Sequence, residues 1–340
     1  MSTQHLPHAL SVVLRGGTLS RLETHAVFAE LLHGGFDPAQ LAGLLGGLAA
    51  RGETPDEIAG AADALRAAMK PFVHGHPDAI DTCGTGGDGL STFNLSTAAA
   101  IVAAACGARV IKHGNRSSSS QCGSADLLEV AGLPLELAPE KARALLDEVG
   151  ITFLFAPAYH PALRHAAAVR KALGTRTLFN YLGPLCNPGR VRRQVVGVPQ
   201  HGRIESTAKA LEQLGHERGF VVHGAGGADE LTLAGENHVR AVGEQAYERL
   251  DAQSLALDAA PVRALAGGDP NTNLAILHSV LDGRASANAD AVALNTAAAL
   301  LVAGRAKDAR AALDLARGAL ANGAAKHTFQ RWIARAREIA

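Results

Sequence analysis

Short runs rich in β-branched and aromatic residues alternate with helical stretches from about residue 78 onward. The β-rich runs are 109–111, 151–155, 194–198 and 220–223, and the helical stretches between them include 139–149 and 203–214. Strands separated by helices are typical of a parallel sheet whose faces are covered by helices. The pattern therefore predicts an α/β domain with a largely parallel central sheet. The Ala-rich segment from about residue 290 onward predicts helix, and we expect it to pack on this domain.

The first seventy residues carry helix-start signals instead of β-rich runs. Ser20 and Glu23 form a capping box, in which each side chain bonds the backbone amide of the other residue. Asp37 and Pro38 supply an N-cap followed by a proline at the first helical position, and the segment 54–57 repeats this arrangement. These signals predict a small all-helical unit ahead of the α/β domain.

The charged side chains balance, with 32 basic and 32 acidic residues among 340. No overall field draws the protein to nucleic acid or to a membrane, so we expect neither as a partner, and phosphate chemistry would need a local pocket. The longest apolar stretch, residues 98–108, is too short to cross a bilayer. The four cysteines show no Cys-x-x-Cys spacing, which disfavours a zinc site or a disulfide framework. We therefore expect a soluble cytoplasmic protein.

A glycine-rich segment, residues 81–89, follows a predicted strand and precedes the apolar helix expected over 98–105. Its glycines let backbone amides converge on an anion. The partial positive charge of the helix N-terminus, which residues 94–97 are expected to cap, adds to the attraction. The segment is therefore suited to bind a pyrophosphate. A flexible turn is the alternative interpretation, because glycine clusters alone often give false positives.

A second polar loop, residues 112–116, follows the next predicted strand, and four serines at 117–120 continue it. Lys112 is expected to face phosphate oxygens as a point charge, and Asn115 to direct its amide toward the acceptor substrate. A solvated basic loop would be the better interpretation of this segment alone. Its position one strand and one loop after the glycine-rich segment favours the binding role.

Four ordered motifs resemble those of the anthranilate phosphoribosyltransferase family, and the resemblance extends over nearly the whole chain. The motifs are Gly84-Thr85-Gly86-Gly87-Asp88, Asn94-Leu95-Ser96-Thr97, Lys112-His113-Gly114-Asn115-Arg116 and the segment 176–188. The resemblance implies an enzyme of tryptophan biosynthesis. It would transfer the 5-phosphoribosyl group of 5-phosphoribosyl-1-pyrophosphate (PRPP) to the amine of anthranilate.

The resemblance also implies an architecture. Residues 1–75, joined by part of 165–190, would form a small helical domain. Residues 76–340 would form a larger α/β domain of the nucleoside phosphorylase and phosphoribosyltransferase kind, with PRPP bound at the hinge. Two Mg²⁺ ions would serve as cofactors, and the helical domains would join two copies into a homodimer.

Individual site residues follow from the same motifs. The expected catalytic residues are Asn115, Arg170 and Lys112, and the expected metal ligands are Ser96, Asp229 and Glu230. The residues expected to bind PRPP are Gly84, Gly87, Asp88, Thr92, Asn94, Leu95, Ser96, Thr97, Lys112, His113, Gly114, Asn115, Arg116, Ser117, Ser118, Ser119, Ser120 and Ser124. Those expected to line the anthranilate site are Gly84, His113, Asn115, His160, Arg170 and Gly183.

Chemistry supports two of these assignments. A planar guanidinium holds a planar carboxylate better than a histidine beside a proline does, which favours Arg170 over His160 for the anthranilate carboxylate. Adjacent carboxylates most often lie in a solvated turn. Asp229 and Glu230, however, follow the predicted strand 220–223 and a short loop, where site residues of α/β proteins are found.

Two other functions stay open at this point. A pyrimidine-nucleoside phosphorylase shares the helical and α/β plan, but it carries a Lys-x-Ser type loop in place of residues 112–116 and lacks the segment 179–188. A non-catalytic nucleic-acid-binding relative would carry a strongly basic face and a degraded glycine loop, whereas the charge here balances and the glycines are present.

Overall fold

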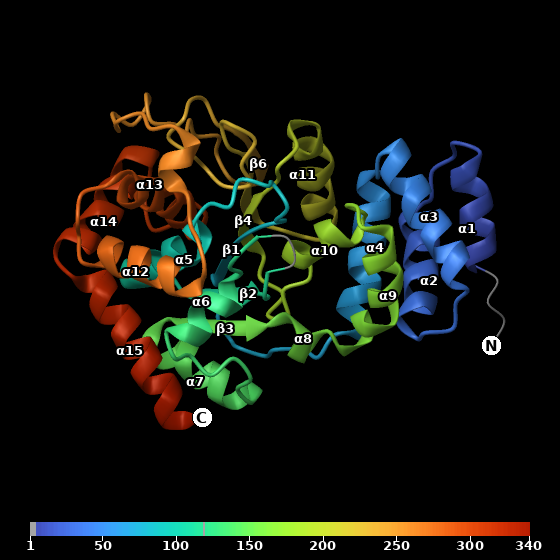
Figure 1. Cartoon of the computed structure of the whole chain (residues 1–340), viewed down its shortest axis with the longest axis horizontal. Helices are drawn as coiled ribbons and strands as arrows, with labels where there is room; N and C mark the ends of the chain where they lie inside the picture. The colour runs from blue at the N-terminus through green and yellow to red at the C-terminus, as the bar shows by residue number, and fades with distance from the viewer. Residues whose placement is uncertain (1–4, 118–119) are drawn as a thin grey trace.

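The computed structural model describes residues 5–117 and 120–340. Its N-terminal helices, at the right of Figure 1, are α1 (His5–Leu14), α2 (Arg21–Leu32), α3 (Pro38–Arg51) and α4 (Pro55–Ala68). Ser20 and Glu23 form the predicted capping box, Asp37 caps α3, and Thr54 forms a second box with Glu57. The predicted helix starts are confirmed, because each depends on bonds within one helical turn.

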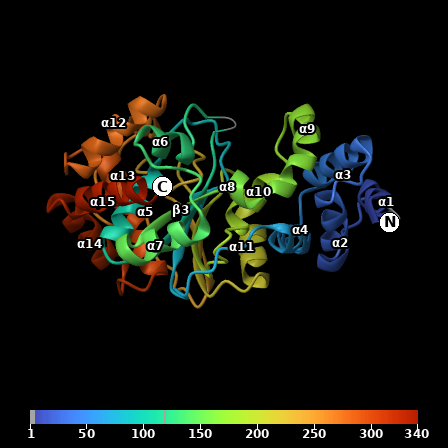
Figure 2. The same cartoon turned by 90° about the horizontal axis from the view of Figure 1, so that it is seen from below.

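Two helices from the middle of the chain, α9 (Arg164–Leu173) and α10 (Phe179–Leu185), lie against this N-terminal group (Figure 2). Their apolar side chains share one core with α2 and α4, in which the Phe28 and Phe179 rings are 5.4 Å apart. We call α1 to α4 together with α9 and α10 the helical unit. It therefore combines segments that are about a hundred residues apart in the sequence.

Six strands form one sheet in the order β3-β2-β1-β4-β5-β6. Their bounds are β1 (Ile80–Gly84), β2 (Val110–Gly114), β3 (Ile151–Phe155), β4 (Arg193–Gly197), β5 (Arg218–His223) and β6 (His238–Gly243). The first five are parallel, and β6 pairs antiparallel with β5 at one edge. The largely parallel sheet confirms the predicted fold class. The sequence does not predict β6, whose residues are mostly half-exposed and show no clear apolar pattern.

Helices cover both faces of the sheet. α5 (Leu95–Ala105) and α13 (Ala287–Val302) contact β1 on one face, and α11 (Ile204–Gln213) contacts β5 on the other. Side chains alternate accordingly: Val195 and Val222 join the core around α13, whereas Val196 and Val221 join the core of the helical unit. Strands that are buried on both faces read as nearly continuous apolar runs, which explains the pattern in the sequence.

The remaining helices complete the larger domain. They are α6 (Ser124–Val130), α7 (Pro139–Val149), α8 (Ala156–Tyr159), α12 (Pro270–Leu281), α14 (Ala309–Ala321) and α15 (Ala324–Ile339), with short 3₁₀ helices at Pro161–Leu163, His201–Arg203 and Val262–Leu265. As expected, the C-terminal helices pack on this domain, where α13, α14 and α15 all contact α5. None of the helices within the described residues is both long enough and apolar enough to cross a membrane.

The order of strands reverses at β1. The chain adds β2 and β3 on one side of β1 and then adds β4, β5 and β6 on the other side. Gly84, at the end of β1, is paired with Gly197 at the end of β4. In open parallel sheets, ligands bind in the crevice that such a reversal leaves at the carboxyl ends of the strands. The topology therefore points to the loop that follows Gly84.

Candidate active site

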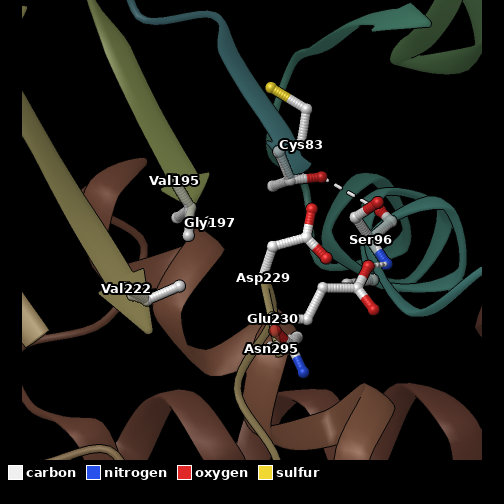
Figure 3. A pocket seen from close by; sticks show the side chains of 10 residues that line it. Cys83, Ser96, Val195, Gly197, Val222, Asp229, Glu230 and Asn295 are labelled. Carbon is white, nitrogen blue, oxygen red and sulfur yellow. Dashed lines mark hydrogen bonds between the residues drawn. The ribbon is translucent and has the colours of Figure 1, made fainter. Parts of the chain in front are cut away.

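Asp229 and Glu230 lie across the carboxyl ends of β1, β4 and β5, and their side chains point toward Ser96 at the start of α5 (Figure 3). Gly84 and Gly197 end two of these strands, and Gly224 follows the third. A Cβ atom at any of these glycines would overlap atoms of Asp229 or Glu230. Glycine at the strand ends therefore makes room for the acidic segment to lie this close to the sheet.

The two carboxylates accept backbone amides. Gly86 N donates to Asp229 Oδ2 at 2.6 Å, and Ser96 N donates to Glu230 Oε1 at 2.8 Å. Burial, followed by the charge of Asp88, raises the pKa of Asp229, and burial, followed by the charge of Asp229, raises the pKa of Glu230. In the described structure, Oδ2 of Asp88 is buried without a hydrogen-bond partner. Buried carboxylates that repel one another are suited to bind a cation.

Over residues 5–117 and 120–340, no set of three or more histidine, cysteine, aspartate or glutamate side chains is arranged as a metal centre. Magnesium does not require such a set, because it binds through one or two carboxylates together with substrate phosphates and water. Asp229 and Glu230 supply two carboxylates, and Ser96 adds a hydroxyl beside them. The small cavity that these residues line is about 10 Å³, which is room for about one water molecule. The residues therefore fit a magnesium ion that arrives with a phosphorylated substrate.

The glycine loop, residues 84–88, lies opposite the N-terminus of α5. Thr85 N donates to Gly197 O at 2.9 Å, which holds the loop against the end of β4. α5 begins at Leu95 and not at residue 98, so Asn94 is its N-cap residue and residues 95–97 form its first turn. The Asn94 side chain bonds other segments: Nδ2 donates to Cys122 O at 3.1 Å, and Oδ1 accepts from Asn273 Nδ2 at 2.9 Å. Asn94 thus joins the start of α5 to the segment before α6 and to α12. The bond from Ser96 N to Glu230 instead brings a carboxylate to the helix N-terminus, where the helix dipole favours negative charge.

Lys112, which is predicted to meet phosphate oxygens, is buried. Its Nζ donates to Thr82 O at 2.8 Å and lies 3.4 Å from Ser96 Oγ. Its charge opposes the rise in the pKa of both Asp81 and Glu230. The ammonium group therefore lies beneath the start of α5, next to the Ser96 hydroxyl, and its positive charge acts on the groups around Ser96.

Arg170, on α9, is partly buried over an aromatic ring. Its guanidinium carbon lies 5.0 Å from the centroid of the Phe179 ring. Burial lowers the pKa of Arg170, and no nearby carboxylate among the described residues opposes that shift. A guanidinium that stacks on a ring and has no acidic partner is suited to a planar carboxylate ligand.

His113 and His160 lie side by side, with ring centroids 5.0 Å apart. His113 Nδ1 lies 3.1 Å from Gly183 O, while in the described structure His113 Nε2 and the ring nitrogens of His160 lack a well-aligned partner. Burial lowers the pKa of His113 to about 3 and that of His160 to about 4, so both rings are neutral at pH 7. The structure thus brings together three residues that the sequence predicts for one substrate.

Two family models match the chain. Residues 76–326 match the glycosyl transferase family a/b domain, and residues 7–69 match the glycosyl transferase family helical bundle domain. An anthranilate phosphoribosyltransferase from Aeromonas hydrophila is 47% identical over 319 residues, which cover 93% of each chain. The chain belongs to the anthranilate phosphoribosyltransferase family.

Solved structures of anthranilate phosphoribosyltransferases have the same fold. The structure from Thermus thermophilus has a TM-score of 0.91 at 45% identity and covers 97% of this chain and 99% of its own. The structure from Saccharomyces cerevisiae in complex with PRPP and Mg has a TM-score of 0.89 at 26% identity and covers 98% of both chains. The predicted family, enzyme class and fold are confirmed.

Other residues predicted from the anthranilate phosphoribosyltransferase motifs lie in the loop after β2. Asn115 is exposed, and its backbone oxygen accepts from Ala125 N at 3.1 Å. Arg116 donates to Glu129 at 2.6 and 2.8 Å, so acidic side chains on α6 already hold its guanidinium. Ser124, the first residue of α6, has its Oγ 3.4 Å from Asn115 O.

The rest of the predicted PRPP set is more dispersed. Ser117 N donates to Asp126 Oδ2 at 2.9 Å, and Ser117 Oγ lies 2.8 Å from Ser120 Oγ. Thr92 forms an isolated β-bridge with Ala266, and the side chains of Leu95 and Thr97 are buried. Ser118 and Ser119 lie outside the described residues.

Arg176 contacts the glycine loop, and the predicted site residues do not include it. It precedes α10 and donates to Gly86 O and, at 3.1 Å, to Thr85 Oγ1, both on the glycine loop. The sequence does contain one signal, since Arg176 opens the segment 176–188 that resembles the anthranilate phosphoribosyltransferase family. That signal does not show which loop the side chain contacts.

Proposed function

We propose that the protein transfers the 5-phosphoribosyl group of PRPP to the amine of anthranilate at the carboxyl edge of the sheet. One observation carries this proposal: the glycine loop, the start of α5 and the Asp229–Glu230 pair meet at the point where the strand order reverses, and together they would bind an anion with its cation. Arg170, from the helical unit, is partly buried without an acidic partner among the residues that the structure describes, and it is suited to an aromatic acid. The glycine loop with the acidic pair suits PRPP and its magnesium, and Arg170 suits anthranilate.

The donor is proposed to bind along the glycine loop and the start of α5. Backbone amides of residues 86–88 and the serines of the loop after β2 would donate to its phosphates. Asp229, Glu230 and Ser96 would hold magnesium, for which we propose two ions, and bound magnesium would neutralise charge that grows on the pyrophosphate. The yeast relative in complex with PRPP and Mg supports this choice of ligand and ion.

The acceptor is proposed to bind between α9 and the end of β2. Arg170 would hold the carboxylate of anthranilate in a bidentate pair. Asn115 would lie near the amine, and His113, His160 and Gly183 would line the ring. The two neutral histidines add no charge that would compete with Arg170 for the carboxylate.

The reaction forms a bond from the amine nitrogen to the anomeric carbon and breaks the bond from that carbon to the pyrophosphate oxygen. The transition state has the character of an oxocarbenium ion, so stabilising the departing pyrophosphate is the main demand on the protein. An arylamine is unprotonated at neutral pH. The residues therefore need to position the two substrates and do not need to activate the nucleophile.

The assembly and the setting are also proposals. Residues 1–75 with part of 165–190 would act as one helical domain against residues 76–340. Leu14 and Leu22, on α1 and α2, are 68% and 82% exposed, and we propose that they lie in a homodimer contact made by the helical units. The cysteines remain thiols in the described structure, which suits a reducing cytoplasm.

The test is to mix the protein with anthranilate, PRPP and Mg²⁺ and to follow anthranilate fluorescence. The fluorescence should fall only when all three are present, and EDTA should stop the decrease. Unchanged fluorescence would refute the proposal. Phosphorolysis of thymidine in its place would identify a nucleoside phosphorylase, and tight binding of DNA or RNA without turnover would identify a nucleic-acid-binding relative.

A further inference from the structure

Arg176 contacts the same glycine loop as Asp229, and its charge opposes the rise in the pKa of Asp229. Asp229 holds the amide of Gly86, whereas Arg176 holds the carbonyl oxygen of the same residue and also reaches Thr85 Oγ1 at 3.1 Å. A Cβ atom at position 87 would overlap the Arg176 guanidinium, and Gly87 has a φ of +73°. The loop is therefore shaped to receive this side chain.

The backbone that carries Arg176 is joined closely to Arg170. Gly174 N donates to Arg170 O at 3.3 Å and ends α9 in the left-handed conformation. On the other side, Thr177 N donates to Asn180 Oδ1 at 2.9 Å. That bond holds the start of α10, whose Phe179 ring lies 5.0 Å from the Arg170 guanidinium carbon. Residue 176 is therefore linked to Arg170 through the backbone on one side and through Phe179 on the other.

These contacts form one continuous path from the glycine loop to α9. Pyrophosphate on the loop would compete with Asp229 for the amide of Gly86, which leaves Arg176 as the side chain that fixes the carbonyl of Gly86. Holding that carbonyl in one place also holds residues 174–180, and with them the guanidinium that is proposed to take the anthranilate carboxylate. Coupling of this kind is reciprocal, so each ligand strengthens the binding of the other by the same factor.

We propose that Arg176 is a positioning residue that couples the two substrate sites, so that anthranilate binds more tightly when the glycine loop holds a pyrophosphate. The inference rests on the proposed function, because it takes Arg170 as the anthranilate ligand. It differs from a direct phosphate contact, in which Arg176 would change donor affinity alone. It also differs from a fixed structural contact, in which Arg176 would change stability alone.

The experiment measures the dissociation constant of anthranilate by calorimetry, without and with saturating inorganic pyrophosphate and Mg²⁺. The ratio of the two constants is the coupling factor, and values of about five or more are typical of allosteric pairs. The variants are Arg176→Gln, which removes the charge and the fork, and Arg176→Lys, which keeps the charge. The control is Lys171→Ala, an exposed residue on α9. Thermal midpoints show whether each variant is folded.

In the unaltered protein, pyrophosphate should tighten anthranilate binding by roughly fivefold or more. Arg176→Gln should reduce that factor to within about twofold of unity while the affinity for pyrophosphate alone changes by less than about threefold, and Arg176→Lys should fall between. Lys171→Ala should keep the full factor.

A full coupling factor in Arg176→Gln would overturn the inference. So would a loss of pyrophosphate affinity that lysine restores while coupling persists, since that result identifies a phosphate ligand. An unaltered protein that consumes anthranilate but shows no coupling would refute this inference alone, whereas one that neither binds nor consumes anthranilate would refute the proposed function.

Discussion

Two glutamates, one in the helical unit and one at the carboxyl ends of the strands, have contrasting surroundings. Glu57 accepts from the backbone amides of Leu19 and Thr54 at 2.9 Å each and pairs with Arg51. Glu230 accepts one hydrogen bond, from the backbone amide of Ser96, and lies beside the like charge of Asp229. Glu57 is therefore satisfied within the helical unit, while the Asp229–Glu230 pair leaves charge for a ligand to satisfy. Perturbed acidic groups gather where a site requires them.

The largest effect should come from breaking the satisfied glutamate. Glu57→Ala leaves Arg51 without its partner and two amides without an acceptor, so the free energy of unfolding should fall by about 3 kcal/mol. Urea denaturation measures this change. The control is Glu23→Ala, which removes the exposed glutamate of the other capping box and should cost about 1 kcal/mol or less. Equal losses of unfolding free energy in Glu57→Ala and Glu23→Ala would contradict the idea that a buried capping box stabilises the protein more than an exposed one.

The next effect concerns Arg170, which has no acidic partner within residues 5–117 and 120–340. Arg170→Ala should raise the KM for anthranilate by tens of fold, which corresponds to about 2 kcal/mol, and Arg170→Lys should recover part of the loss. Arg164→Ala, an exposed change on the same helix, should cost less than about 0.5 kcal/mol. Steady-state kinetics with anthranilate varied at saturating PRPP provide the comparison. Unaltered anthranilate kinetics in Arg170→Ala would remove this residue from the site.

Changes at Asp229 and Glu230 should have the opposite consequence to a change at Glu57: they should impair activity and should not lower stability. Asp229→Asn and Glu230→Gln should each lower turnover by at least about tenfold and raise the Mg²⁺ concentration needed for half-maximal activity. Because each change removes charge repulsion, the thermal midpoint of the free protein should stay the same or rise. Glu236→Gln, an exposed change a few residues away, is the matched control. A normal Mg²⁺ requirement in both amide variants would refute the metal assignment.

The smallest effect is a pH dependence of stability that arises from His160. The pKa of His160 is about 4 in the folded protein and about 6.5 in an unfolded chain, so protonation favours unfolding. The contribution of His160 to the free energy of unfolding is fully present above about pH 6.5 and is lost as the pH falls toward 4. Between pH 7.5 and 5.5 the loss is about 1 kcal/mol. Urea denaturation at each pH in that range gives the free energy of unfolding. This free energy should fall less steeply with decreasing pH for His160→Gln than for the exposed control His327→Gln. Parallel slopes in the two variants would rule out His160 as a source of the pH dependence.

The predictions from the sequence succeed where the relevant bonds are local or repeat along the chain. The capping boxes at Ser20 and Thr54 depend on a residue three positions away, and the parallel strands are apolar because both of their faces are covered. The edge strand β6 has neither signal, since it is half-exposed and is defined by pairing with β5. The helix expected over 98–105 begins earlier, at Leu95, and the Asn94 side chain that precedes it bonds Cys122 and Asn273, which lie far away in the sequence.

The sequence by itself determined the helix starts, the α/β class and, through its motifs, the family and the chemistry. Only the tertiary structure decided which groups meet: Lys112 lies beneath Ser96 and not on an open loop, and Arg176 reaches the glycine loop some ninety residues away. The physical reason is distance along the chain. A bond within one turn is encoded by neighbouring residues, whereas a contact between the end of β1 and the segment before α10 depends on how the whole sheet and the helical unit pack.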